Sequence, residues 1–562
     1  MSSYLNGSKL TSPSWARWFP FLRWQRPNGP LLRGEIVAGI TVALVIIPQS
    51  VAYAALAGMP LVTGVYAAFI PALVAVLWSA SPRLSVGPTA LTSLLVAASL
   101  HGLAQPGSTD WVMLAVWLAL ISGAMQLALG AGKFAWILNL VSSPVLAGFT
   151  QAATVLIIVS QLPALLGLQG APGDWLGAPK FDLAAASFGL VTLALLLLAK
   201  RFAPQFPMVM VAMVGAGALS YATHYASAGG AVIGAVPGGL PSPVWPGMPA
   251  LATLAVLIVP AMVISLVSFL ETASSAKAES QATHLPWNDN QDLMAQGLAK
   301  IASGLTGSFP TSSSFARSAL NLYAGARTGW ATVATVVAVG LLLLWFTPAL
   351  YHVPSAVLAA VVIAAVSGLF KPSIFLRLWG LVRIEALILA TTFFVTIITA
   401  PRIYWGVLTG VLLGLTHFLY QRLHPRIIEV GLHGDGSLRD RHLWQLAPLA
   451  PRMFALRMDA ELDFASASTL ERTVADYLAH HPGTAHIVLF AQPINRVDAT
   501  GIEVFAAVRR SLVQQGITLH ISGIKLPVET LLRSAGELPD SPLLHLYRTD
   551  AEALAHFAAL QD

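Results

Sequence analysis

The chain carries the segment Ser85-Val86-Gly87-Pro88-Thr89-Ala90 and, 222 residues further on, the segment Gly307-Ser308-Phe309-Pro310-Thr311-Ser312. Each has a proline followed by a threonine and a small residue, and each adjoins a short apolar stretch. Proline is favoured at the start of a helix because the N–H that it lacks has no partner there. Short spans interrupted by glycine and proline at matching positions of two halves are typical of transporter binding sites. The two segments therefore predict two half-helices.

A second pair of residues keeps the same spacing. Gln49 lies 39 residues before Pro88, and Glu271 lies 39 residues before Pro310. If each repeat contains seven membrane spans, the odd number inverts the second copy relative to the first. We therefore expect an α-helical polytopic membrane protein of about 14 spans, built as a seven-plus-seven inverted repeat.

The composition also indicates a membrane protein. The 562 residues are 56% hydrophobic and only 10% charged, whereas a soluble globular chain has roughly 25% charged residues. A soluble cytosolic enzyme is thereby excluded. A span needs about 20 mostly apolar residues, and the expected spans, some of them short, are 36–57, 62–79, 86–101, 111–130, 143–162, 183–199, 207–222, 251–272, 290–305, 312–325, 329–347, 353–370, 384–400 and 403–421.

The charged residues divide the chain into parts. Of 56 charged side chains, 28 lie in residues 425–562. We expect a cytoplasmic N-terminal segment (1–35), a transmembrane transport domain (36–424) and a cytoplasmic C-terminal domain (425–562). An even number of spans puts both termini on one side, and the Lys and Arg of the loops place that side in the cytoplasm, with the body in the inner (plasma) membrane. These basic loops account for the high isoelectric point, so no nucleic-acid partner is predicted.

Two charged residues lie in apolar segments. Glu271 ends an apolar run that starts near Leu251, and Arg317 lies in the short tenth span among serines. A charge inside the bilayer costs about 2.5–3.5 kcal/mol on insertion scales, so such residues normally face a partner or a cavity. Glu271 and Arg317 could form a structural ion pair, or Glu271 could reach the membrane interface beside Lys277.

The other interpretation is an anion site. Half-helix N-termini that meet in the membrane would direct free N–H groups and positive dipole ends at one point. Backbone donors at 88–91 and 311–315 would then hold an oxyanion beside Arg317. Protonation of Glu271 could accompany anion binding, because its charge repels the substrate. Gln49 and Tyr53 share one helix face and form either a packing kink with an interfacial ring or a wall that faces the substrate.

The last part of the chain changes its hydrophobic period. Strands are predicted at 454–458, 487–490 and 518–522, and amphipathic helices at 466–480, 501–515 and 527–535. Alternating strands and helices predict a small α/β domain. The chain has no cysteine, and no His cluster or paired catalytic groups converge on a loop. We therefore expect no cofactor, no metal and no enzymatic activity.

Several of these segments resemble the SulP family of anion transporters, sulfate permeases and relatives of prestin, which carry a C-terminal STAS domain. The resemblance covers residues from about 15 to 558. It rests on Pro48-Gln49-Ser50-Val51-Ala52-Tyr53-Ala54, the segment 85–90, Glu271-Thr272-Ala273, Gly307-Ser308-Phe309-Pro310, Ser314-Phe315-Ala316-Arg317-Ser318-Ala319-Leu320-Asn321, and Asp498-Ala499-Thr500-Gly501.

The resemblance implies an elevator-like transporter and a homodimer, with the anion between the third and tenth spans. It implies proton coupling at Glu271. Many relatives have serine where this chain has Ala316, so that hydroxyl contact is missing. The expected substrate-binding residues are Gln49, Tyr53, Pro88, Thr89, Ala90, Thr311, Ser312, Ser313, Ser314, Phe315, Ala316 and Arg317.

The C-terminal domain is similar to bacterial anti-sigma-factor antagonists, whose phosphorylated serine precedes a glycine. Thr500 stands at that position, so it is either a regulatory site or the N-cap of a helix that begins near Gly501.

The sequence therefore predicts a secondary active transporter of an inorganic oxyanion, with proton-coupled sulfate uptake as the first hypothesis. A bicarbonate or dicarboxylate symporter, or an anion exchanger, is the alternative within transport. An anion channel is the alternative of another class.

Overall fold

Each of the fourteen expected spans contains a helix. A computed structural model describes residues 19–169, 180–203 and 206–559 and divides into two units, Met1–Gly414 and Leu415–Asp562. The helices of the first unit are α1 (Gly29–Leu56), α2 (Leu61–Ala67), α3 (Ile70–Trp78), α4 (Ala90–Leu100), α5 (Thr109–Ala131), α6 (Ser143–Leu166), α7 (Leu183–Phe202), α8 (Met208–Ala222), α9 (Leu251–Thr283), α10 (Asp289–Leu305), α11 (Phe315–Tyr323), α12 (Trp330–Leu341), α13 (Ser355–Val366), α14 (Ser373–Leu381), α15 (Arg383–Ile398) and the first part of α16 (Tyr404–Leu423).

The helices differ greatly in length. Within the described residues, seven helical stretches are long and apolar enough to cross a membrane by themselves. The others include α4 and α11, which have 11 and 9 residues, as expected for half-helices. α14 is an additional helix that lies between two expected spans. The division between the two units falls inside α16, with the second unit beginning at Leu415, about ten residues before the expected boundary at 425.

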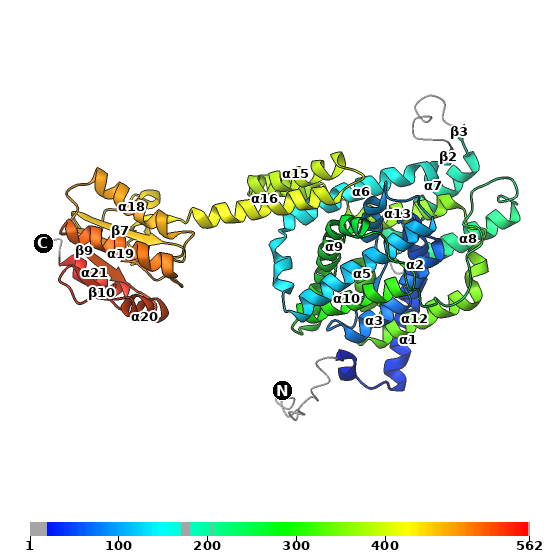
Figure 1. Cartoon of the computed structure of the whole chain (residues 1–562), viewed down its shortest axis with the longest axis horizontal. Helices are drawn as coiled ribbons and strands as arrows, with labels where there is room; N and C mark the ends of the chain where they lie inside the picture. Colours follow the sequence, from blue (N-terminus) through cyan, green and yellow to red (C-terminus); the bar gives the residue numbers. More distant parts are fainter. Residues whose placement is uncertain (1–18, 170–179, 204–205, 560–562) are drawn as a thin grey trace. The chain divides into compact units, whose positions relative to one another are not determined.

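Two helices of the first unit cross at backbone contact. A Cβ atom at Gly123 of α5 would lie 2.8 Å from the carbonyl oxygen of Gly297 on α10, and one at Gly297 would lie 2.7 Å from the oxygen of Gly123. Small residues allow such close crossings in membrane helices. α9 also packs against α5, so α5, α9 and α10 lie side by side (Figure 1).

Two short strand pairs complete the described part of the first unit. β1 (Val86–Gly87) pairs antiparallel with β4 (Ser312–Ser313), and β2 (Leu168–Gln169) pairs antiparallel with β3 (Lys180–Phe181). The β1–β4 pair directly precedes α4 and α11. It therefore joins the two segments that the sequence singled out as repeats.

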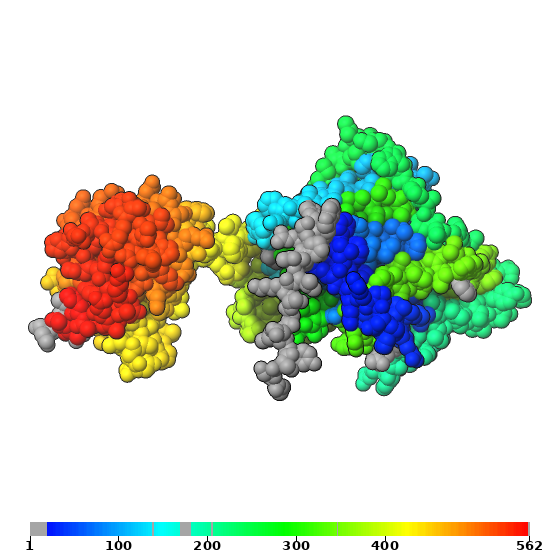
Figure 2. Space-filling view, turned by 90° about the horizontal axis from the view of Figure 1, so that it is seen from below, coloured from blue at the N-terminus to red at the C-terminus, as the bar shows by residue number. Residues whose placement is uncertain are grey.

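The second unit is an α/β domain. Its sheet has the order β10-β9-β8-β7-β5-β6, with β7 to β10 parallel. Figure 2 shows one outer face of this unit, in which its orange and red parts form a continuous surface. Its elements are β5 (Ile427–Leu432), β6 (Leu438–Asp440), α17 (Arg441–Trp444), β7 (Met453–Met458), α18 (Ala467–His480), β8 (His486–Phe490), α19 (Ala499–Gln514), β9 (Thr518–Ser522), α20 (Leu526–Ser534), β10 (Leu544–Tyr547) and α21 (Asp550–Ala558).

The faces of this sheet are covered by different helices. Leu456 and Leu489 pack in a cluster with α18, α19 and α20, whereas Ala455 and Val488 pack in a cluster that includes Phe557 of α21. Alternate residues of a strand point to opposite faces. The three predicted strands and three predicted helices of this domain are confirmed, with their ends shifted by up to two residues.

A histidine is buried in this domain. His520 on β9 is 1% exposed, and its Nδ1 and Nε2 lie 3.0 Å from the Tyr547 hydroxyl and 3.2 Å from Nδ1 of His486. Burial, with the positive charge that His486, His545 and His556 would carry, lowers the pKa of His520 to about 3. The ordinary pKa of histidine is about 6.5. Between these two values the unfolded chain therefore binds one more proton than the folded domain.

The free energy of unfolding of residues 415–562 should consequently fall as the pH drops from about 6.5 toward 3, by about 1.4 kcal/mol per pH unit from this group. Above pH 6.5 the group contributes no pH dependence. Urea unfolding of the purified domain at several pH values would measure the slope. His520→Phe should reduce the slope by about one proton, and an unchanged slope would contradict the assignment.

Candidate anion-binding site

The two repeats meet through the β1–β4 pair. Val86 lies opposite Ser313, and Gly87 lies opposite Ser312. The N–H of Ser314 also donates to the carbonyl oxygen of Ser85 at 3.0 Å. Because α4 and α11 begin a few residues beyond this pair, their N-termini are held close together. The structure thus confirms that the two half-helices meet.

Each half-helix has a capping residue. The Thr89 side chain accepts from the N–H of Thr92, and Thr92 Oγ1 accepts in return from the N–H of Thr89. In α11, Ser314 accepts from the N–H of Arg317. These caps satisfy the third N–H of each helix and leave the first two N–H groups of each available.

The remaining donors near the N-termini have no partner in the part of the protein that the structure describes. Among the described residues, no acceptor lies on the N–H groups at positions 90, 91, 315 and 316. The buried hydroxyls of Thr311 and Ser313 are also without a partner in this part of the chain. Unpaired buried donors at helix N-termini are the groups that bind anions. Phe315 and Ala316 at the start of α11 are exposed.

Arg317 lies in the first turn of α11 and is 2% exposed. Its guanidinium donates through Nε to Ser85 Oγ (3.3 Å), and its terminal nitrogens donate to Gln49 Oε1 (3.2 Å) and to the carbonyl oxygen of Pro88 (3.0 Å). A Cβ atom at Gly87 would lie 3.6 Å from the guanidinium. Arg317 therefore ties α11 to α1 and to the start of α4.

Glu271 is the acidic group of the site. Its Oε2 accepts a hydrogen bond from Thr89 Oγ1 at 3.1 Å. It interacts electrostatically with Arg317, but among the described residues the two form no ion pair within 4.0 Å, since Arg317 donates elsewhere. The alternative of a direct Glu271–Arg317 ion pair is therefore wrong.

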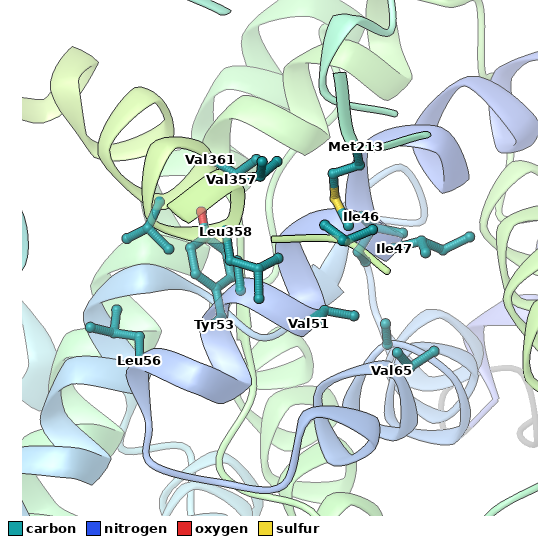
Figure 3. Packing of buried hydrophobic residues seen from close by; sticks show 14 of the residues in the cluster. Ile46, Ile47, Val51, Tyr53, Leu56, Val65, Met213, Val357, Leu358 and Val361 are labelled. Atoms are coloured by element: carbon teal, nitrogen blue, oxygen red, sulfur yellow. The ribbon is translucent and has the colours of Figure 1, made fainter. Parts of the chain in front are cut away.

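Tyr53 and Gln49 differ in their surroundings. Gln49 contacts Arg317, whereas Tyr53 is 5% exposed and belongs to an apolar cluster. In Figure 3 the Tyr53 ring lies close to Leu358 of α13, with Met213 of α8 in the same cluster. The structure thus brings Gln49, and the segments that contain Pro88, Thr89, Ala90, Thr311, Ser312, Ser313, Ser314, Phe315 and Ala316, to one place around Arg317, and puts Tyr53 at its edge.

The sequence reasoning missed a second buried cation. Lys300 on α10 is fully buried, and its Nζ donates to Gln126 Oε1 at 2.8 Å and to Ser268 Oγ at 2.9 Å. Its signal was a lone lysine among small and apolar residues inside the expected span 290–305. Arg317 is therefore not the only positive charge near Glu271.

Thr500 lies in the first turn of α19 and is exposed. The cap of this helix is Asp498, whose side chain accepts from the N–H of Gly501 at 2.8 Å. The expectation that Thr500 caps the helix is therefore wrong, because α19 begins earlier, at Ala499.

Comparisons with known proteins agree with this fold. The profile of the Sulfate permease family matches residues 32–392, and that of the STAS domain matches residues 447–553. A probable sulfate transporter of Mycobacterium tuberculosis is 31% identical, over 98% of this chain and 99% of its own length. The chain belongs to the sulfate permease family. It is an anion transporter with a C-terminal STAS domain, and it is not an enzyme.

One further sequence relative and two solved structures are also similar to this chain. The Sodium-independent sulfate anion transporter of Bos taurus is 28% identical, over 92% of this chain and 88% of its own. A murine anion transporter of the Solute Carrier 26 family, solved in the inward-facing state, aligns with a TM-score of 0.87 at 18% identity, over 100% of this chain and 97% of its own. The transmembrane domain of a cyanobacterial bicarbonate transporter aligns with a TM-score of 0.59 at 19% sequence identity, over 69% of this chain and 99% of its own length. These two likenesses show the shared sulfate permease fold.

Proposed function

We propose that this member of the sulfate permease family takes up a divalent inorganic oxyanion together with protons. Sulfate is the first candidate substrate. The observation that supports this most is the pair of half-helix N-termini, joined by β1 and β4, whose first N–H groups have no acceptor among the described residues. Arg317 adds a full positive charge beside them. Preorganised donors and a buried cation favour an anion that has lost its water shell.

The proposed substrate contacts are the twelve residues expected from the sequence, with Glu271 as the proton-coupling group. Several relatives are named as sulfate transporters, which favours sulfate over bicarbonate as the substrate. The Glu271 carboxylate bonds to Thr89, at the N-cap of α4. An ionised carboxylate at this position opposes the entry of an anion, so loading of the proton and of the substrate would favour each other.

The mechanism that we propose is alternating access by an elevator-like movement of one part of the membrane unit against another. The packing of Tyr53 with α13 and α8 would lie along the sliding surface. The second candidate is bicarbonate or dicarboxylate transport, or exchange. A channel would use the same donors without alternating access.

Uptake into proteoliposomes tests the proposal. Radiolabelled sulfate should accumulate against its gradient when the pH outside is lower than inside, and the rate should saturate with concentration. A proton ionophore should abolish the accumulation. Linear uptake that ignores the ionophore would support a channel, and accumulation that depends on a counter-anion would support an exchanger.

We further propose that the protein is a homodimer in the plasma membrane with both termini in the cytoplasm.

The exposed Thr500 lies at the N-terminus of α19, where a helix stabilises negative charge, and we propose it as a regulatory phosphorylation site. The membrane unit has its own apolar clusters, which supports independent binding of substrate.

Removal of residues 425–562 should therefore leave a protein that still binds sulfate within about threefold of the full-length affinity, although its abundance in the membrane falls. Calorimetric titration of the purified truncated protein with sulfate measures this. If well-folded truncated protein binds no sulfate, the C-terminal domain is part of the binding unit.

A further inference from the structure

Lys300 is a buried cation that the proposed function does not use. Its ammonium donates to an amide and a hydroxyl oxygen, Gln126 Oε1 and Ser268 Oγ, and the residue is 0% exposed. Among the described residues it makes no ion pair within 4.0 Å. Burying such a charge is costly, so buried cations in membrane segments usually serve function.

The packing of three helices places this cation behind the anion site. The close crossing at Gly123 and Gly297 brings Gln126 and Lys300, one turn further along α5 and α10, into contact. On α9, Ser268 accepts from Lys300 through its hydroxyl, and its carbonyl oxygen accepts from Ser312 Oγ of β4 at 3.1 Å.

The charged groups around this point are few. Glu271 lies one turn after Ser268, the α9 partner of Lys300. It also accepts from Thr89, the neighbour of the Arg317 partner Pro88. α5 contributes the neutral Gln126. At an acidic pH, where Glu271 is neutral and Lys300 carries its proton, Arg317 and Lys300 are two positive charges near the half-helix N-termini.

We propose that Lys300, in its protonated form, determines the valence of the transported anion, by supplying the second positive charge that a dianion requires. This role rests on the proposed function. The attraction between a fixed charge and an anion is proportional to the charge of the anion, whereas its desolvation cost rises more steeply with charge. Loss of Lys300 therefore weakens binding of a dianion much more than binding of a monoanion of the same shape.

Sulfate and perchlorate are suitable probes because both are tetrahedral oxyanions and they carry two charges and one charge. Calorimetric titration of the purified full-length protein would give both dissociation constants at one acidic pH. The ionic strength is held constant with the salt of a large organic anion. In Lys300→Met, we expect sulfate affinity to fall by roughly tenfold or more relative to perchlorate affinity. Because the comparison is a ratio, a partly unfolded sample does not change it.

Two further variants separate charge from packing. Gln126→Glu keeps the size of the side chain and still provides an acceptor for Lys300, but the new carboxylate neutralises the charge of Lys300 locally. This variant should therefore show the same selective loss of sulfate binding. Lys300→Arg should retain most of the preference. Lys277→Met is the matched control, since Lys277 is an exposed lysine on α9.

The outcomes are distinct. An unchanged ratio of the two dissociation constants in Lys300→Met and Gln126→Glu, in a protein that binds sulfate as wild type, would overturn the role of Lys300 alone. A wild-type protein that binds neither anion would overturn the proposed function and this role with it.

Discussion

Arg317→Ala should abolish saturable sulfate uptake. The substitution removes the full positive charge next to the half-helix N-termini, and it leaves Gln49 Oε1, Ser85 Oγ and the Pro88 carbonyl oxygen without the donor that now holds them. Truncation of one partner of a buried, hydrogen-bonded charge pair, here the guanidinium and the proposed anion, typically costs about 2–5 kcal/mol of binding free energy. We therefore expect sulfate affinity to fall by about a hundredfold. Uptake into proteoliposomes and calorimetric titration measure the two effects.

Two other variants show whether the charge or the geometry matters. Arg317→Lys keeps the charge but replaces the planar fork of donors by a single ammonium, so it should bind sulfate with intermediate affinity. Arg327→Ala is the matched control, because Arg327 is exposed and contributes backbone groups to the hydrogen bonds around it. Near-normal sulfate affinity in folded Arg317→Ala protein would contradict the anion site.

Glu271→Gln should make uptake independent of pH. In the wild type, acidification of the outside should increase the rate and allow accumulation, because a proton must neutralise Glu271 as the anion binds. Glutamine resembles the protonated carboxyl in size and can still accept the bond from Thr89 Oγ1. We therefore expect this variant to carry sulfate down its gradient with a flat pH profile, and to lose accumulation driven by a proton gradient.

A second carboxylate on the same helix provides the control. Glu279 is also buried in α9, two turns further along, and lies 4.0 Å from Arg83. Glu279→Gln should keep the pH dependence of the wild type, whatever its effect on abundance. If Glu271→Gln retains the wild-type pH profile, the proton is coupled through another group.

Much of the architecture was predictable because it depends on local patterns. Apolar segments predicted fourteen regions, each of which contains a helix, and the change of hydrophobic period after 450 predicted three strands and three helices of the C-terminal domain. The shared motif around Pro88 and Pro310 predicted that the half-helices form a site. The N-cap at Asp498 was missed because three neighbouring residues, Asp498, Thr500 and Gly501, all suit a helix start, and only the backbone path decides between them.

The polar partners inside the membrane unit were not predictable in the same way. Gln49 and Arg317 are 268 residues apart in the chain, and Gln126 and Lys300 are 174 apart, yet each pair is in hydrogen-bond contact. Such contacts depend on how closely and at what angle helices cross, and a difference of one helix turn would separate them.

By itself the sequence determined that the chain crosses a membrane, that two half-helices repeat, and that an acid and an arginine lie among apolar residues. The tertiary structure alone decided that Arg317 holds Gln49 and Pro88 rather than Glu271, and that Lys300 stands behind Ser312. The physical reason is that apolar periodicity is a property of neighbouring residues, whereas the partner of a buried charge is set by the crossing of distant helices, here at Gly123 and Gly297.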